Sequence, residues 1–311
     1  MASARPPLAL AVALLIGAPA CAATPPATGP PTAPPSAAAI AVYNLDGAGR
    51  LKPTDVEWHA ESRTFFVSTY NQGALYQGGL DDPLTPAFLR GQPGQTADGI
   101  RVAGGRIYVA AGTEAQIRVY DLATRQRTGT FTTGPGRHVI DLEVTGPGDV
   151  YVTDAILPML WHLTPDQVAA GSGTAQGIPV TPEVSLHGDS NLNGVVALTD
   201  RRLIVGNRTD GKLYRIDLDG TGGRTILPIT GVTVPLNCGM ALDGNRLLVA
   251  DATGLAAVAL GDDAGSATLV EQIRDPSFHD TASVTVADGR YLVANYATQT
   301  PDTVSSVPAR R

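Results

Sequence analysis

The sequence is short of cysteine, of basic residues and of helical periodicity. Its 311 residues include two cysteines, Cys21 and Cys238, so a framework of disulfides cannot hold the fold together. Lys and Arg number 22 against 29 Asp and Glu, which gives a formal net charge of -7, and no basic run occurs. A chain without a basic patch lacks the electrostatic footprint of a phosphate-binding surface, so nucleic acid is not an expected partner.

Motifs of several enzyme classes are also absent. The sequence has no Gly-x-Ser-x-Gly element, no Cys-x-x-Cys pair and no phosphate-binding loop, which argues against serine hydrolase, thiol redox and nucleotide chemistry. Five histidines lack the spacing of zinc ligands: His59, His138, His162, His187 and His279. Of these, His187 precedes Asn193 in a loop and is the expected candidate for an acid or a base.

The first 39 residues differ from the rest of the chain. Residues 1–20 contain an apolar run from Leu8 to Ile16 followed by small residues, which is typical of a secretory signal and too short to span a membrane. Two interpretations stay open: simple cleavage ahead of Cys21, or a lipoprotein signal in which the thiol of Cys21 is acylated. Residues 21–39 are rich in proline and predict an extended linker. We therefore expect an exported protein, whether secreted, periplasmic or anchored to an envelope.

From residue 40 onward one pattern recurs six times. Strand-like runs centre on valines that are spaced by 42, 43, 53, 44 and 44 residues. These valines are Val67, Val109, Val152, Val205, Val249 and Val293. The long step holds an insertion, residues 169–188, which we expect to lie over one face and to shape a binding site.

Each unit also contains further apolar runs, separated by turns rich in Gly and Asp. Four short strands per unit are the signature of a β-propeller blade, so the sequence predicts an all-β fold, a six-bladed β-propeller over residues 40–311. Apart from one turn at 164–170, no helical period is sustained, which argues against alternating strands and helices.

The last unit lacks a clear fourth strand, and the strand-like residues 39–47 have no unit of their own. We therefore expect this N-terminal strand to complete the sixth blade and to close the ring. A closed ring has no need of a partner, so a monomer is expected.

The first strand of every propeller blade lines the central tunnel, so residues just ahead of these strands should meet at one mouth. The positions 11 or 12 residues before the aligned valines are Asp55, Asp98, Asp141, Asn193, Cys238 and Ala282. We call these six positions the mouth ring. Five of them carry side chains that can donate electrons to a cation, so the pattern predicts a polar site at the mouth.

These motifs resemble those of the senescence marker protein, gluconolactonase and strictosidine synthase-like superfamily of six-bladed propellers. "LNGVVAL", with Asn193, is similar to its Asn-Gly element, and "CGMALDG" to its Asp-Gly-Met element, with Cys238 at the aspartate. "KPTDVEWH" is similar to its Pro-Glu-Gly-x-x-Trp opening, with Thr54 at the metal-binding glutamate and Trp58 at the tryptophan. The resemblance covers nearly all of the chain after residue 40.

The resemblance implies a divalent cation that polarises a lactone carbonyl. Of the three residues that hold the cation in hydrolytic members, only Asn193 is kept here. Three mouth-ring carboxylates could replace the others, and such oxygens suit Ca²⁺, whereas a thiolate at Cys238 would favour softer metals. The expected roles are metal ligation by Asp55, Asp98, Asp141 and Asn193, catalysis by Cys238 and His187, and substrate contact by Thr54, Trp58 and Asn237.

Each candidate also has a purely structural interpretation. Asp98 and Asp141 would cap turns by accepting backbone N–H bonds, Cys238 would fill a small buried space, and Trp58 would pack in the channel. A second polar series ends the second strand of four blades, and turn hydrogen bonding is its expected role: Asp154, Asn207, Asp251 and Asn295.

Two functions follow from these interpretations. The first is an exported, lactonase-like hydrolase that acts on a small cyclic ester or sugar lactone with a divalent cation at the mouth. The second is a non-catalytic secreted propeller that binds a small ligand or a protein partner at the same mouth.

Overall fold

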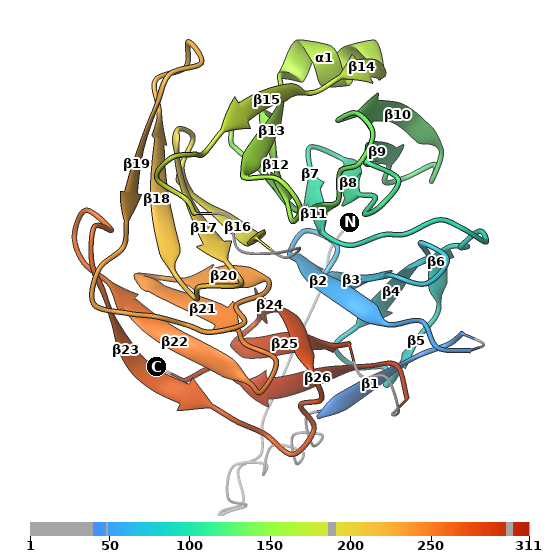
Figure 1. Cartoon of the computed structure of the whole chain (residues 1–311). Helices are drawn as coiled ribbons and strands as arrows, with labels where there is room; N and C mark the ends of the chain where they lie inside the picture. The colour runs from blue at the N-terminus through green and yellow to red at the C-terminus, as the bar shows by residue number, and fades with distance from the viewer. Residues whose placement is uncertain (1–39, 48, 186–190, 297–300, 311) are drawn as a thin grey trace, which may run out of the picture. The chain divides into compact units, whose positions relative to one another are not determined.

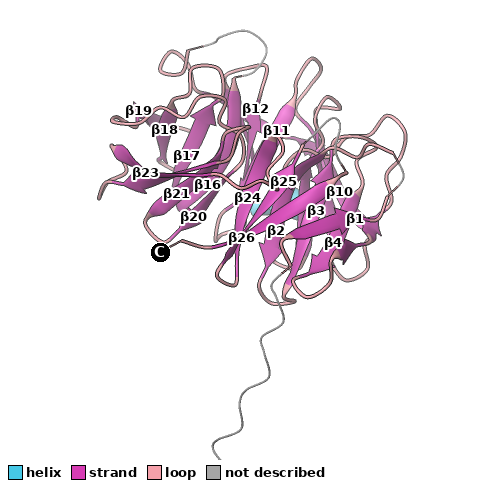
Figure 2. Ribbon diagram, turned by 90° about the horizontal axis from the view of Figure 1, so that it is seen from below, coloured by secondary structure: helices cyan, strands magenta, loops and turns pink. Residues whose placement is uncertain are grey.

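Short antiparallel strands make up most of the described chain. The computed structural model describes residues 40–47, 49–185, 191–296 and 301–310, which all fall within the unit Ala39–Arg311. The strands of this unit form six sheets, and in five of them the strand order follows the chain outward from an innermost strand. Figures 1 and 2 show these sheets from two directions.

Each sheet is one blade of four principal strands. The innermost strands are β2 (Pro53–His59), β7 (Ile100–Ala103), β11 (Val139–Val144), β16 (Leu192–Thr199), β20 (Met240–Asp243) and β24 (Thr281–Ala287). The second strands are β3 (Thr64–Thr69), β8 (Arg106–Ala110), β12 (Val150–Asp154), β17 (Arg202–Asn207), β21 (Arg246–Ala250) and β25 (Arg290–Asn295). The third strands are β4 (Leu75–Gly79), β9 (Gln116–Asp121), β13 (Met159–Leu163), β18 (Leu213–Leu218), β22 (Leu255–Leu260) and β26 (Thr303–Pro308). The fourth strands are β6 (Ala87–Leu89), β10 (Arg127–Thr132), β15 (Gln176–Pro179), β19 (Arg224–Pro228), β23 (Ala267–Ile273) and β1 (Val42–Leu45).

The six innermost strands form a ring. Each contacts the innermost strand of the next blade, and β24 of the sixth blade contacts β2 of the first (Figure 1). The prediction of an all-β, six-bladed β-propeller is therefore confirmed. Within the described ranges the only helix is α1 (Pro165–Ala170), N-capped by Thr164, and no helix there is long and apolar enough to cross a bilayer.

The sixth sheet takes strands from both ends of the described chain. Its third strand is β26, and β1 pairs antiparallel with it, with Val42 opposite Ser305. A short strand, β5 (Leu84–Thr85), then pairs in parallel with β1. Tyr43 of β1 is fully buried and its ring lies 4.9 Å from that of Phe65 in the first blade. The segment therefore supplies a fourth strand and also packs against the neighbouring blade.

The insertion in the third repeat differs from expectation. We expected residues 169–188 to lie over one face, but β15 pairs with β13 as the outermost strand of the third blade. Ahead of it, β14 (Ser172–Thr174) pairs in parallel with β10 of the second blade. The third repeat has no other apolar run after β13, so the insertion provides the missing strand. Residues 186–188 lie outside the described residues.

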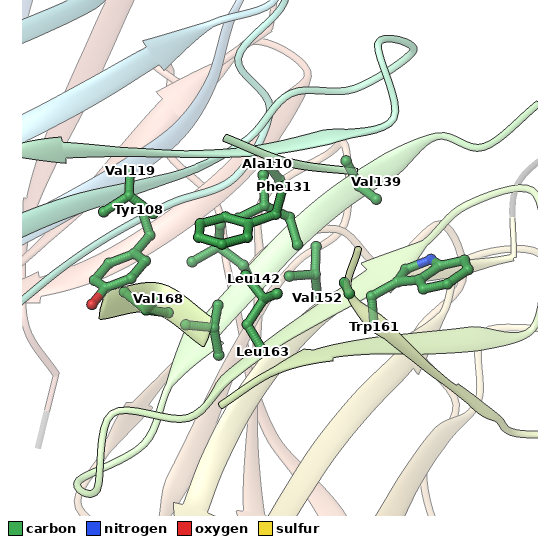
Figure 3. Packing of buried hydrophobic residues seen from close by; sticks show 13 residues of the cluster. Tyr108, Ala110, Val119, Phe131, Val139, Leu142, Val152, Trp161, Leu163 and Val168 are labelled. Carbon is green, nitrogen blue, oxygen red and sulfur yellow. The ribbon is translucent and has the colours of Figure 1, made fainter. Parts of the chain in front are cut away.

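Apolar side chains fill the space between neighbouring blades. Between the second and third blades, Phe131, Leu142 and Leu163 are fully buried, and Val168 of α1 packs beside them (Figure 3). Each such side chain contributes roughly 1.5–3 kcal/mol relative to its exposed state. Because both faces of a blade are covered, second strands such as β12 are buried along their whole length instead of alternating.

The polar residues that end the second strands bind turns, as predicted. Asp154 accepts hydrogen bonds from the backbone N–H of Ile156 at 2.9 Å and from Nε1 of Trp161 at 3.1 Å. Asn295 accepts a bond from the backbone N–H of His279 at 3.0 Å. These side chains are fully buried, so their bonds satisfy groups that water cannot reach.

Deleting residues 40–45 should destabilise the whole propeller. β26 would lose its antiparallel partner, and the buried ring of Tyr43 would leave a cavity, which costs at least about 3 kcal/mol. Thermal unfolding measures the effect, and a chain that begins at residue 40 and keeps β1 is the matched control. Equal melting temperatures for the two chains would contradict this role of β1.

Candidate functional site

A pocket of about 330 Å³ lies where the innermost strands begin. All six mouth-ring residues line it, and every blade contributes at least one of them. We call it the mouth pocket. Its size is at the small end of the range for sites that enclose a small organic molecule.

The mouth ring rests on β-bulges in four of the six blades. The strand register shifts around Thr54 in β2, Asp141 in β11, Asn193 in β16 and Ala282 in β24. A bulge bends the strand and re-aims its side chains, which explains how both Thr54 and its neighbour Asp55 reach the pocket.

Glycines follow three mouth-ring residues because the inner strands approach closely there. A Cβ atom on Gly99 would lie 2.6 Å from Cα of Asp141, and one on Gly194 would lie 2.3 Å from the carbonyl oxygen of Cys238. The backbone N–H of Gly99 donates to the carbonyl of Ile140 at 2.7 Å. The Asp-Gly, Asn-Gly and Cys-Gly pairs of the sequence thus reflect contact between neighbouring blades.

Asp55 and Asp141 tie the blades together with their carboxylates. One oxygen of Asp55 accepts the backbone N–H of Ile100 in the second blade at 2.7 Å, and the other accepts bonds from its own blade and from Ser283 in the sixth. Asp141 accepts the backbone N–H of Val195 in the fourth blade at 3.0 Å. Asp141 thus accepts backbone N–H bonds, as its structural interpretation expected, but from the inner strand of the next blade as well as from Leu142.

A buried arginine that the repeat pattern did not predict lies among these carboxylates. Nη1 of Arg101 lies 3.3 Å from Oδ2 of Asp55 and 3.9 Å from both Oδ1 of Asp141 and Oε2 of Glu57, and Nε lies 3.6 Å from Oε2 of Glu143. We call the four carboxyl groups the tunnel cage. The sequence does contain a signal for this arrangement. Strands β2 and β11 both contain Asp-x-Glu, and β7 between them carries Arg101. Residues two apart on a strand point to the same side, so the Asp and Glu of each strand both face the tunnel.

The tunnel cage holds more negative groups than its single cation can neutralise. Burial raises the pKa of Glu57 to about 8 and that of Asp141 to about 7, although Arg101 opposes both shifts. Burial also raises the pKa of Asp55 against the same charge. Burial works to lower the pKa of Arg101, but Asp141, Glu143 and the other cage carboxylates outweigh it, so the pKa rises and the guanidinium stays charged. Part of the cage is therefore protonated at neutral pH.

The donor set of the mouth does not fit a divalent cation well. The inward oxygens of Asp55 and Asp141 already accept backbone N–H bonds, and the guanidinium of Arg101 occupies the space between these carboxylates. In the part of the chain that the structure describes, no group of three His, Cys, Asp or Glu side chains has metal-binding geometry. Asn193 lines the pocket, but its neighbours do not complete a cation shell.

Asp98 differs from the other ring aspartates because it pairs with a histidine. Its Oδ2 lies 3.1 Å from Nε2 of His138, which also lines the mouth pocket. Burial raises the pKa of Asp98, opposed by His138. Burial works to lower the pKa of His138, but the hydrogen bond and charge of Asp98 outweigh it and the pKa is raised. No spacing rule predicts this pair, since His138 stands three residues before Asp141, the mouth-ring residue of its own blade.

Two tyrosines form an aromatic wall beside this pair. The ring of Tyr70 lies 6.4 Å from that of His138, stacked at 25°, and 6.4 Å from the ring of Tyr296, edge to face. Nζ of Lys52 lies 5.5 Å and 5.2 Å from the centres of the two tyrosine rings. Both tyrosines line the pocket, so their rings form part of its apolar wall.

Cys238 lines the pocket next to a guanidinium. Nη1 of Arg208 donates to its Sγ and, at 3.0 Å, to the carbonyl of Leu236. Burial raises the pKa of the Cys238 thiol, although Arg208 opposes the shift. A thiol held neutral is a poor nucleophile, so the structure favours Cys238 as a wall residue over a catalytic one.

The remaining predicted residues divide between the pocket and its surroundings. Thr54 lines the pocket, but its hydroxyl donates to the carbonyl of Ala97 at 2.8 Å. Trp58 is not among the lining residues: Asp55 and Glu57 face the tunnel, so alternation turns Trp58 toward the packed interface with the sixth blade. Asn237 is fully buried behind the pocket, where it donates to the carbonyls of Asn207 and Val234. His187 lies outside the described residues.

Comparison with known proteins supports the fold and identifies no family. No family and no curated protein matches the sequence. The structure is similar to luciferin-regenerating enzyme, with a TM-score of 0.63 and 14% identity over 88% of this chain and 96% of that one. It is similar to virginiamycin B lyase from Staphylococcus aureus, with a TM-score of 0.60 and 12% identity over 87% and 88%. It is also similar to U3-55K, with a TM-score of 0.64 and 10% identity over 86% and 98%.

The likeness establishes the propeller fold alone. The resemblance to a particular superfamily therefore still rests on the sequence motifs. At 10 to 14% identity the neighbours include enzymes and WD40 proteins, so the fold by itself selects no activity.

Replacing Glu57 with glutamine should flatten the pH dependence of stability. A carboxyl group whose pKa is raised in the folded state, here to about 8, stabilises the fold below its unfolded pKa and loses that contribution as pH rises through the folded pKa. Between pH 5 and pH 8 the wild type should lose at least about 1.4 kcal/mol more than Glu57→Gln, the equivalent of one pKa unit. Urea unfolding measures both slopes, with exposed Glu61→Gln as the control. Parallel curves for wild type and Glu57→Gln would contradict the buried-charge account.

Proposed function

We propose that the chain is an exported hydrolase that opens a small cyclic ester or sugar lactone in the mouth pocket. The observation that carries this proposal is the Asp98–His138 pair, a buried carboxylate 3.1 Å from an imidazole inside a pocket of suitable size. A histidine oriented by a carboxylate is a common general base and acid near neutral pH.

The proposed reaction uses residues of the pocket alone. Nε2–H of His138 donates to Asp98, which leaves Nδ1 to take a proton from water as the water oxygen bonds to the ester carbonyl carbon. The guanidinium of Arg208, which also lines the pocket, supplies positive charge for the oxyanion. The ring C–O bond then breaks, and the imidazolium returns its proton to the departing alkoxide. Tyr70 and Tyr296 would hold the ring of the substrate.

The divalent cation implied by the resemblance remains a prediction. Ca²⁺ at Asp55, Asp98, Asp141 and Asn193 would supply Lewis acidity. The backbone N–H bonds that Asp55 and Asp141 accept, and the guanidinium of Arg101 beside Asp55, speak against that arrangement.

Export and a monomeric state are also proposed, the first from the sequence of the N-terminal segment and the second from the topology of the blades. The signal in residues 1–20 and the acylation of Cys21 rest on segments outside the described residues. A monomer is proposed because each blade has its four strands within one chain.

A second candidate function is a non-catalytic propeller that binds a small ligand or a protein partner at the same mouth. The observation that favours it is the loss of two of the three metal-binding residues of the hydrolytic pattern, at Thr54 and Cys238. A panel of lactones separates the two, because the binder would retain a ligand without turning it over.

His138→Gln and Asp98→Asn should each lower kcat/KM for the best lactone of such a panel by roughly 10²- to 10⁴-fold, the usual contribution of a general acid–base group. The matched control is His162→Gln. His162 also pairs with an aspartate, Asp149, at 2.6 Å, but it stacks on Tyr151 away from the pocket. Unchanged kcat/KM in the two pocket variants, or no turnover of any lactone by the wild type, would refute the proposal.

A further inference from the structure

A buried ion pair, Glu114 with Arg118, lies beside the segment that carries Asp98. Oε2 of Glu114 is 2.8 Å from Nη2 of Arg118, and the side chain of Arg118 is only 2% exposed. A cation buried to this degree is costly unless its partners are well placed, and replacing one partner of such a pair strongly destabilises a fold. The partners of this pair converge on Thr96, two residues before Asp98.

The ion pair holds both backbone groups of Thr96. Oε2 of Glu114 accepts the backbone N–H of Thr96 at 2.7 Å, and Nη2 of Arg118 donates to the carbonyl of Thr96. Nη1 of Arg118 also donates to Oε1 of Gln95 at 2.9 Å. Two charged side chains therefore fix the backbone that leads into Asp98.

The turn that carries Glu114 also contacts the segments of Asp98 and His138. A Cβ atom on Gly112 would lie 2.4 Å from Oδ2 of Asp98, the oxygen that pairs with His138. Gly112 has a φ of 41°, in the left-handed region that favours glycine. Its carbonyl accepts the backbone N–H of Val139, the residue after His138, at 3.3 Å. A shift of this turn would therefore change how the carboxylate and the imidazole meet.

We propose that Glu114 and Arg118 are positioning residues for the Asp98–His138 pair, which they align through the backbone of Thr96. This inference rests on the proposed hydrolysis, because it assigns a support to the acid–base pair of that reaction. Neither Glu114 nor Arg118 lines the mouth pocket, so each can influence the reaction only through the groups that it holds.

Arg118→Met should lower kcat for the best lactone of the panel by roughly 10- to 100-fold, because a misplacement of about 1 Å at a reacting group can cost about 10²-fold. KM should stay within about twofold of the wild-type value, since the variant removes no contact with the substrate. The matched control is Arg215→Met, which removes another buried arginine. Arg215 pairs with Asp217 at 3.0 Å, away from the pocket, and its loss should leave kcat unchanged.

A double-mutant cycle with His138→Gln separates positioning from a general loss of stability. A residue that acts through His138 has nothing left to position in that background, so Arg118→Met should not lower the residual kcat of His138→Gln any further. A fall in kcat of equal size in both backgrounds would overturn the proposal, as would an unchanged kcat in folded Arg118→Met.

The hydrogen bond between His138 and Asp98 gives a second measurement that needs no substrate. In protein labelled with ¹⁵N-histidine, the Nε2–H proton of His138 should exchange with solvent at least about tenfold faster in Arg118→Met than in the wild type or in Arg215→Met. Equal exchange rates in folded Arg118→Met and the wild type would contradict the positioning role.

Two further results leave the proposal decidable. Should Arg118→Met fail to fold, Glu114→Gln replaces it in both measurements, because it keeps the size of the side chain and removes the charge that Arg118 needs. Should the wild type open no lactone, the proposed hydrolysis fails, and the exchange rates alone then decide whether the ion pair aligns His138 and Asp98.

Discussion

The tunnel depends on balancing buried charge. Asp55 and Asp141 must face inward because their oxygens accept backbone N–H groups of the next inner strands, and those bonds fix the spacing of the blades. Carboxylates in that position are costly unless they are paired or protonated. Arg101 pairs with the carboxylates, and the raised pKa values of Glu57 and Asp141 favour protonation, which reduces the remaining negative charge. The same groups thus serve blade packing and the electrostatics of the mouth.

The chemistry proposed for the mouth pocket does not use the cage, although Asp55 and Asp141 of the cage also line the pocket. Asp55 and Asp141 bond backbone N–H groups, whereas the carboxylate of Asp98 pairs with His138. The pocket is then walled by the two tyrosines and by Cys238 with Arg208. The chemistry proposed for this site uses proton transfer and fixed positive charge, whereas the resemblance drawn from the sequence implies a metal ion.

The sequence predicted what depends on local pattern. Turn signals and apolar runs repeat with the length of a blade, so six blades and the mouth ring followed from spacing. The partners of Arg101 did not, because they lie on other strands and only alternation along β2 and β11 hints at them. The same alternation explains why Trp58 misses the pocket. The Asp98–His138 pair joins a ring position to a loop residue forty positions later, and no periodic rule connects the two.

The most direct measurement is a crystal structure of the wild-type protein grown in millimolar Mn²⁺, with an anomalous difference map at the manganese edge. The account predicts planar guanidinium density for Arg101 among Asp55, Glu57, Asp141 and Glu143, and no anomalous peak in the tunnel. An anomalous peak coordinated by those carboxylates, with Arg101 displaced, would contradict it.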